Sequence, residues 1–138
     1  MIKKSLEIKD LTQKEGHAIN LLVNQLQQAL EKKYQIKAEI QRGNPIVSKE
    51  DNYDALGYPK DEVTLSERYT RYVSKDLILR TQMTSVMPEV LRTYSSNLQD
   101  SKLWLCPGIV YRRDVVDKTH VGEPHQMDVW YLKKGITT

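Results

Sequence analysis

The sequence predicts an α/β (α+β) fold in which helices flank a sheet, and three observations predict it. Apolar residues recur at helical spacing over residues 13–33, a strand-like alternation follows over residues 35–41, and residues 107–132 are typical of a hairpin. The chain has 138 residues, of which 39% are hydrophobic, so it can bury one modest core. We therefore expect residues 1–138 to form a single domain.

Composition and charge limit the classes of protein. The net charge of +3 is compatible with a nucleic-acid partner but too mild to argue for one. The one cysteine, Cys106, precludes an intramolecular disulfide, fits a reducing compartment and is expected to be a buried small hydrophobe beside Trp104. The sequence has neither an apolar run of membrane-spanning length nor an N-terminal signal-peptide core, so we expect a cytoplasmic protein with no membrane partner.

The first predicted element is a helix from about Gln13 to Lys33. Thr12 is a candidate N-cap, and Glu15 three residues later completes the pattern of a capping box. One apolar stripe is made by Ile19, Leu22, Val23, Leu26, Ala29 and Leu30. Such a stripe usually packs in a core, and His17, which lies off it, is expected at the surface.

A strand is predicted directly after this helix, because Ile36, Ala38 and Ile40 alternate with polar residues. The strand is expected to stop before Pro45, since proline has no N–H for a ladder and Gly43 permits a turn.

Residues 51–61 predict an irregular, turn-rich connection, with apolar anchors at Tyr53, Leu56 and Tyr58. The apolar run of residues 77–79 predicts a buried strand, and a helix is expected through residues 88–92. Thr84 or Ser85 can cap that helix, and Pro88 is acceptable in its first turn.

The hairpin of residues 107–132 carries the charged and amide side chains. A period of two puts Val110, Arg112 and Asp114 on one face of the first arm, opposite Tyr111 and Arg113. On the second arm it groups Gln126, Asp128, Trp130 and Leu132, opposite His125, Met127, Val129 and Tyr131. The connection over residues 115–124 is longer than a plain hairpin needs, and long connections are more often functional.

These residue types suit a polyanion that also carries an amine. The guanidinium of Arg112 offers a rigid fork for a phosphate, and Gln126 and Asp128 can accept hydrogen bonds from an ammonium group. Spacing alone favours a plainer alternative, in which Arg112 and Asp114 form a surface salt bridge and the second arm is solvated.

Three short motifs in order carry a family resemblance. Residues 110–114 are Val-Tyr-Arg-Arg-Asp, residues 117–120 are Asp-Lys-Thr-His, and residues 125–128 are His-Gln-Met-Asp. Together they resemble the second signature motif of class II aminoacyl-tRNA synthetases, in the form found in the phenylalanyl-tRNA synthetase α subunit. Residues 103–132 would be that motif's hairpin, and residues 12–45 resemble the first motif, which builds the dimer interface in the family.

The resemblance implies a mainly antiparallel sheet flanked by helices and ATP-dependent activation of phenylalanine or a relative, followed by transfer to tRNA. It implies that Arg112 is catalytic and holds the α-phosphate of ATP, that Asp114 fixes the adenosine or amino-acid end, and that His120 approaches the β- or γ-phosphate. It also implies Mg²⁺ as a helper in neutralising phosphate charge, with no protein nucleophile and no metal site built from the side chains.

The same resemblance implies that Gln82, Thr84, Gln126 and Asp128 bind the amino acid. Residues 79–85, Leu-Arg-Thr-Gln-Met-Thr-Ser, resemble a family motif in which a histidine stands at the position of Gln82. Glutamine can hydrogen-bond there but cannot titrate, which puts phenylalanine itself in doubt as the substrate. Pro124 replaces an aromatic residue of the family pattern, and Asp128 replaces a longer glutamate.

The family's third motif, a Gly-rich strand and helix with an arginine, is absent from these 138 residues. We therefore expect an incomplete core that is inactive alone, with an open sheet edge and self-association or a second subunit contacting the helix of residues 13–33. One alternative is a non-catalytic paralogue that serves as a tRNA- or protein-binding regulatory module. Another is an α/β domain unrelated to synthetases.

Overall fold

The computed structural model describes residues 2–59, 61, 68–94, 101–113 and 122–135. In chain order the described elements are α1 (Ile2–Leu6), α2 (Ala18–Tyr34), β1 (Ala38–Ile40), β2 (Ile46–Ser48), α3 (Lys49–Asn52), the 3-10 helix η1 (Asp54–Leu56), β3 (Leu77–Leu79), the 3-10 helix η2 (Met83–Val86), α5 (Met87–Thr93), β4 (Lys102–Ile109) and β5 (His125–Leu132). The chain thus contains both helices and strands, as the predicted fold class requires.

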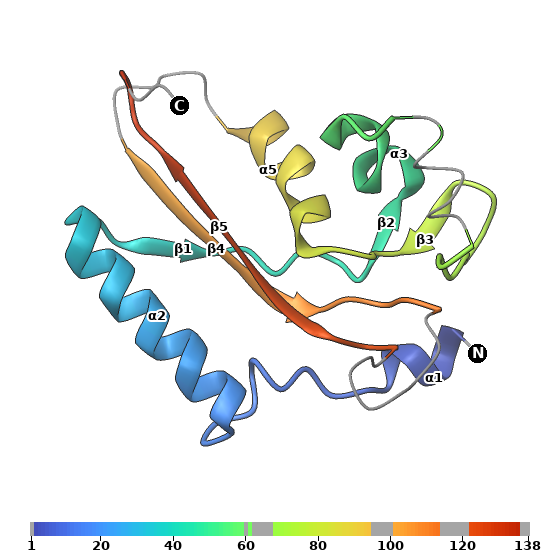
Figure 1. Ribbon diagram of the computed structural model, residues 1–138, viewed down its shortest axis with the longest axis horizontal. Helices are drawn as coiled ribbons and strands as arrows, with labels where there is room; N and C mark the ends of the chain where they lie inside the picture. The colour runs from blue at the N-terminus through green and yellow to red at the C-terminus, as the bar shows by residue number, and fades with distance from the viewer. Residues whose placement is uncertain (1, 60, 62–67, 95–100, 114–121, 136–138) are drawn as a thin grey trace.

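The strands form two sheets. The larger has the order β1-β4-β5, in which β4 pairs antiparallel with β5 and parallel with β1. The smaller pairs β2 antiparallel with β3. In Figure 1 the β4–β5 hairpin runs through the middle of the molecule, with α2 and α5 on opposite sides. The prediction of an antiparallel-rich sheet flanked by helices is confirmed, and the hairpin begins at Lys102, one residue before the motif hairpin of residues 103–132 that the resemblance implies.

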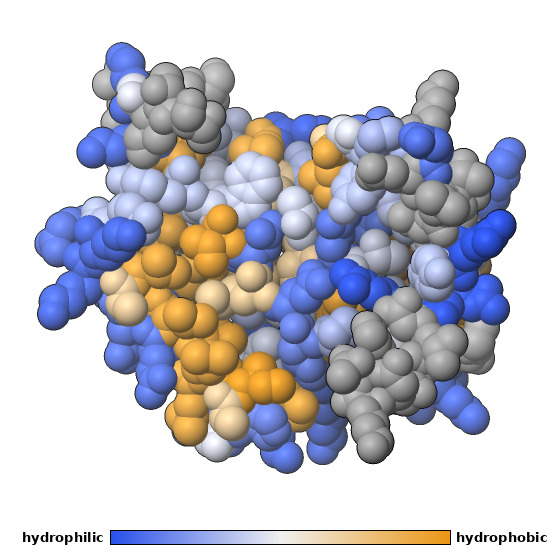
Figure 2. All heavy atoms as spheres, in the orientation of Figure 1, coloured by the Kyte–Doolittle hydropathy of each residue, from blue (hydrophilic) through white to orange (hydrophobic). Residues whose placement is uncertain are grey.

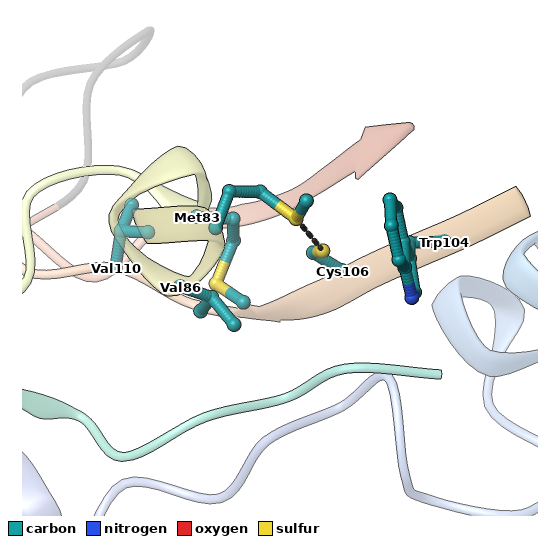
Figure 3. Close-up of a cluster of buried hydrophobic side chains, with 6 residues drawn as sticks. Met83, Val86, Trp104, Cys106 and Val110 are labelled. Atoms are coloured by element: carbon teal, nitrogen blue, oxygen red, sulfur yellow. Dashed lines mark hydrogen bonds between the residues drawn. The ribbon is translucent and has the colours of Figure 1, made fainter. Parts of the chain in front are cut away.

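The main hydrophobic cluster lies between the hairpin and the segment of η2 and α5. It consists of Met83, Val86, Met87, Trp104, Cys106 and Val110 (Figure 3). The Cys106 side chain is fully buried, and its Sγ lies 3.7 Å from Sδ of Met87, so the prediction of a buried small hydrophobe is confirmed. Burial, together with the negative charge of Asp128, raises the pKa of the thiol to about 12.

Helix α2 begins at Ala18, later than the sequence predicts, and the predicted capping box is wrong. His17 is the N-cap: its ring Nδ1 accepts a hydrogen bond of 3.1 Å from the backbone N–H of Ile19. Thr12 is buried instead, where its backbone N–H and its hydroxyl donate to Asp10 and its hydroxyl accepts from Arg42 at 2.6 Å. Residues 11–16 therefore form turns and bends, with Thr12 bonded locally to Asp10 and over 30 residues to Arg42, so the helix does not start at Gln13.

The apolar stripe of α2 is largely exposed, so the expectation that it packs in a core is wrong for most of its length. Val23 is the one residue of α2 that is fully buried, whereas Leu22 and Leu26 are 55% and 39% exposed. Leu21 beside them is 50% exposed. Figure 2 shows hydrophobic side chains gathered over the part of the surface where α2 lies in Figure 1.

The strand of residues 77–79 and the helix after it were predicted correctly, but the helix cap was not. Ile78 and Leu79 are fully buried in β3, and Pro88 lies in the first turn of α5. The N-cap of α5 is Val86, with no side-chain cap, because Thr84 and Ser85 belong to the preceding turn η2.

Among the described residues, none of the helices combines the length and apolar character that crossing a lipid bilayer would require.

Candidate functional site

The hairpin places the predicted site residues on one face. Gln126 lies opposite Gly108 and Asp128 opposite Cys106 in the β4–β5 register. The same register continues beyond the strands, because the N–H of Arg112 donates to the carbonyl of Gly122 at 2.8 Å. Since side chains alternate across a strand, Arg112, Gln126 and Asp128 share the face that packs against η2 and α5.

Arg112 is half-buried beside the segment that follows β3. Its Nε donates a hydrogen bond of 3.2 Å to the carbonyl of Thr81, and within the described part of the chain its two terminal nitrogens remain to meet a ligand. Asp114 and His120, the other two residues predicted to bind ATP, lie outside the described residues. The plainer alternative of an Arg112–Asp114 salt bridge therefore stays open.

Gln126 and Asp128 are each held by a neighbour. The side-chain oxygen of Gln126 accepts a hydrogen bond of 3.2 Å from the backbone N–H of Met83. Oδ2 of Asp128 accepts from the indole Nε1 of Trp130 at 2.8 Å. Both carbonyl and carboxylate oxygens have further lone pairs, so each side chain keeps capacity for an ammonium group.

Gln82 is bonded to Asn52 of α3 and to Tyr58, which follows η1, two residues that the sequence did not connect with the site. Its Nε2 donates to the backbone carbonyl of Asn52 at 2.9 Å, and its Oε1 accepts from the hydroxyl of Tyr58 at 2.9 Å. The fully buried Asn52 side chain makes two hydrogen bonds to Thr81. Its Nδ2 donates to the Thr81 hydroxyl at 2.9 Å, and its Oδ1 accepts from the backbone N–H of Thr81 at 3.0 Å. The amide of Gln82 is thus fixed in orientation, with one N–H left for a ligand.

A pocket of about 440 Å³ opens beside these residues. Its polar lining is Tyr58, Gln82 and Thr84, and its apolar lining includes Met87, Leu91 and Trp130. The structure therefore brings Gln82 and Thr84 together in one pocket.

Residues 81–84 are the common centre of the site. Arg112 contacts Thr81, Gln126 contacts Met83, and Gln82 and Thr84 line the pocket. Asp128 reaches this centre through Trp130, which also lines the pocket. All the predicted site residues that the structure describes are thus within one neighbourhood.

Arg80, which directly precedes residues 81–84, joins this segment to β4 of the hairpin. Its side chain is only 3% exposed, and it donates from Nε to the carbonyl of Ile109 at 2.8 Å and from Nη1 to the carbonyl of Arg42. Burial lowers its pKa from the ordinary arginine value. Gly108 leaves room for this guanidinium, since a Cβ at that position would stand 2.6 Å from Nη2 of Arg80.

In the described ranges of the chain, His, Cys, Asp and Glu form no group of three or more that could hold a metal ion. Mg²⁺ is commonly bound by one or two carboxylates together with substrate phosphates, so it needs no such group.

Comparison with known proteins identifies the family of the chain. Residues 2–138 match the family model for the tRNA synthetases class II core domain (F). The mitochondrial phenylalanine–tRNA ligase of Dictyostelium discoideum is 32% identical over 124 residues, covering 87% of this chain and 26% of the relative. The phenylalanine–tRNA ligase α subunit of Lactiplantibacillus plantarum is 31% identical over 129 residues, covering 94% of this chain and 36% of that subunit. The chain thus spans only about a quarter to a third of these relatives.

The fold has solved counterparts. The pyrrolysyl-tRNA synthetase of Desulfitobacterium hafniense superposes with a TM-score of 0.59 over 92% of this chain and 43% of that one, at 16% sequence identity. This likeness supports the fold, and the family match covers nearly the whole chain. The chain therefore belongs to the class II tRNA synthetase core-domain family, in its phenylalanyl type.

Proposed function

We propose that this chain is part of a phenylalanyl-tRNA synthetase-like catalytic domain, which activates an amino acid with ATP and transfers it to tRNA. One observation carries the proposal: Arg112 and Gln126 project from one face of the hairpin and both bond to the backbone of residues 81–84. A phosphate-binding fork and an amine-binding group are thereby held at one centre, which the joining of ATP to an amino acid requires.

In the proposed reaction, a carboxylate oxygen of the amino acid attacks the α-phosphorus of ATP. The new oxygen–phosphorus bond forms as the bond to the β-phosphate oxygen breaks, and pyrophosphate leaves. Arg112 donates to the α-phosphate oxygens, where negative charge develops. Asp114 is proposed to fix the adenosine or amino-acid end, and His120 the β- or γ-phosphate. Mg²⁺ would arrive with the nucleotide and neutralise phosphate charge.

Gln126 and Asp128 are proposed to hold the α-amino group. Asp128 supplies the countercharge through the carboxylate oxygen that Trp130 does not occupy, and Gln126 supplies a neutral acceptor. Gln82 and Thr84 are proposed to meet the substrate from the pocket. The proposed amino acid is phenylalanine or a relative, because the relatives of this chain are phenylalanine–tRNA ligases. The amide of Gln82 cannot titrate as a histidine can, which puts phenylalanine itself in doubt.

We propose that residues 1–138 form one domain and that the exposed face of α2, made of Leu21, Leu22 and Leu26, contacts a second copy or another subunit. The exposure of these leucines supports this, since an apolar row on one helix is costly to leave in water. We also propose a cytoplasmic location. The Dictyostelium relative is named as a mitochondrial enzyme, so cell fractionation should compare the cytoplasm with mitochondria.

A non-catalytic binding module is the second candidate, and one observation favours it. Both ends of the Gln82 amide are already engaged by Asn52 and Tyr58, as expected of a position that supports the fold. In that case the chain would bind tRNA or a protein without forming an aminoacyl adenylate.

Titration of ATP into the purified chain, followed by ligand-observed NMR up to millimolar ATP, tests the proposed function. We expect Arg112→Ala to weaken ATP binding at least roughly tenfold, because the fork supplies charge-assisted hydrogen bonds. Arg113→Ala is the matched control: this neighbour is exposed on the opposite face and should change affinity less than about twofold. Equal affinity in the native chain and Arg112→Ala would exclude the proposed role of Arg112.

Catalysis needs a separate assay, since phosphate binding alone does not distinguish the two candidates. ATP–pyrophosphate exchange should be measured with a panel of amino acids, on this chain and on a chain extended by the third motif of a relative. Exchange that appears only with an amino acid and is lost in Arg112→Ala supports the enzyme. ATP binding without exchange in both chains favours the binding module.

A further inference from the structure

We infer that Arg71 is a positioning residue that fixes the backbone of Arg112 and thereby aims its guanidinium at the phosphate. This inference rests on the proposed function, in which Arg112 holds the α-phosphate of ATP. Arg71 lies between η1 and β3, far in sequence from the hairpin that it contacts.

The guanidinium of Arg71 joins both arms of the hairpin where they leave the sheet. Its Nη2 donates to the backbone carbonyl of Arg112 at 2.8 Å and lies 3.5 Å from the carbonyl of Gly122. Its Nη1 donates to Oε1 of Glu123 at 2.6 Å. One side chain thus binds the outgoing arm and the returning arm together.

The same guanidinium also reaches the N-terminal helix. Nη1 of Arg71 donates to Oγ of Ser5 in α1 at 2.9 Å, and Ser5 is 4% exposed. The Arg71 side chain itself is only 12% exposed. A surface ion pair with Glu123 alone would contribute little to stability. A buried guanidinium that donates in fixed directions to Ser5, Glu123 and the carbonyl of Arg112 instead holds these groups in place.

These contacts fix the backbone on both sides of the Arg112 side chain. The N–H of Arg112 donates to Gly122 at 2.8 Å, its carbonyl accepts from Arg71, and the next N–H, that of Arg113, donates to Tyr69 at 2.8 Å. The direction of a side chain follows from its backbone. Loss of the hydrogen bond from Arg71 to the carbonyl of Arg112 would therefore allow the Arg112 guanidinium to take other positions. Small misplacements of a binding group have large effects on reacting geometry.

Gly122 shows how closely the guanidinium is seated. A Cβ at Gly122 would stand 2.7 Å from Nη2 of Arg71 and 3.3 Å from the carbonyl of Arg112. Gly122→Ala therefore displaces the guanidinium while leaving its charge in the protein. It offers a second way to disturb the contact when Arg71 itself is unchanged.

A double-mutant cycle on ATP affinity tests the inference. Arg71→Met should weaken ATP binding roughly tenfold in the native chain but less than about twofold in the Arg112→Ala background, because Arg71 acts only through Arg112. Gly122→Ala should behave in the same way. Arg92→Met is the matched control, since Arg92 binds Asp51 on the surface away from the hairpin and should leave affinity unchanged.

The outcomes separate this inference from the proposed function. If Arg112→Ala itself leaves ATP affinity unchanged, the proposed function fails. If Arg112→Ala weakens ATP binding while Arg71→Met does not, the inference is overturned. It is also overturned if Arg71→Met weakens ATP binding equally in the native and Arg112→Ala backgrounds, because Arg71 is then merely structural. Circular dichroism must show that each variant is folded, and Arg71→Lys, which keeps the charge without the fork, replaces Arg71→Met if the latter does not fold.

Limited trypsin digestion gives a readout that needs no ATP. The carbonyl that Arg71 binds belongs to the peptide bond that trypsin cuts after Arg112. Cleavage after Arg112 in the folded protein should be roughly tenfold faster in Arg71→Met and in Gly122→Ala, and unchanged in Arg92→Met. Equal cleavage rates in all four proteins would show that Arg71 does not hold this backbone.

Discussion

The side-chain oxygen of Gln126 accepts a hydrogen bond of 3.2 Å from the backbone N–H of Met83, which joins β5 to the first residue of η2. This bond connects the face of the hairpin with the segment that carries Gln82 and Thr84. Gln126, which is proposed to bind the amine, and the pocket lined by Gln82 and Thr84 are therefore directly connected by a hydrogen bond.

Gln126→Leu should lower the free energy of unfolding by roughly 1–2 kcal/mol, because the N–H of the buried Met83 would lose its acceptor. Urea unfolding monitored by tryptophan fluorescence measures the change. Gln25→Leu, at an exposed position of α2, is the control and should change stability by less than about 0.5 kcal/mol. A Gln126 variant as stable as the control would show that this bond contributes nothing.

Asn52→Ala should be more damaging, with a loss of roughly 2–4 kcal/mol. The fully buried Asn52 side chain makes two hydrogen bonds to the half-buried Thr81, and truncation removes both of them and leaves a cavity at residue 52. Asn24→Ala on the exposed side of α2 serves as the comparison in the same unfolding experiment. The contrary result would be equal stability of the two variants.

Cys106 should resist thiol reagents in the folded protein. Its side chain is fully buried and burial raises its pKa to about 12, so almost no thiolate is present at pH 8. Ellman's reagent should label less than about a tenth of the protein in buffer and nearly all of it in guanidinium. Rapid labelling of the native protein would mean that the main hydrophobic cluster opens readily.

Asp10 should make stability depend on acid pH. Burial opposes ionisation of its carboxyl, but hydrogen bonds from Thr12 and Gln13 and the charge of Arg42 outweigh it, so its pKa is lowered below 3.8. A lowered folded pKa gives stability that is present above the unfolded pKa and lost as the pH falls through the folded one. The difference in unfolding free energy between the native chain and Asp10→Asn should therefore be largest near neutral pH and shrink below about pH 4. A difference that is constant from pH 7 to pH 2 would contradict this.

Leu22→Glu should abolish association while leaving the fold intact. Leu22 is 55% exposed on α2, so the substitution should change stability by less than about 1 kcal/mol. Sedimentation velocity of the native chain should show a concentration-dependent dimer that the variant lacks. Gln28→Glu, at another exposed α2 position, makes the same change in net charge and is the control. A native chain that stays monomeric would leave a different subunit as the partner, to be tested by co-expression.

Much of the site could be predicted because strand alternation is a local property. Once residues 102–132 form a hairpin, a period of two is enough to place Arg112, Gln126 and Asp128 on one face. The buried strand at residues 77–79 likewise follows from a short apolar run.

The contacts that the sequence did not predict are those made across long separations. Asn52 meets Thr81 over 29 residues, and Arg71 meets Arg112 over 41, so no local pattern marks either pair. The start of α2 was wrong for the same reason: the bond between Arg42 and Thr12, which are 30 residues apart, overrides the local capping signal. The turn-rich connection of residues 51–61 was predicted, but its link to Gln82 needs three-dimensional information.

The parallel pairing of β1 with β4 has a consequence for the order of folding. The indole of Trp104 in β4 bonds to Glu39 in β1 across 65 residues, and among the described strands β4 is the one that pairs with β1, so this pairing waits until β4 has been made. The β4–β5 hairpin pairs neighbouring segments and can form first, since closing a long loop is slow. On the ribosome, α2 and β1 would therefore emerge well before their strand partner, and the exposed leucines of α2 would be accessible to chaperones during that interval.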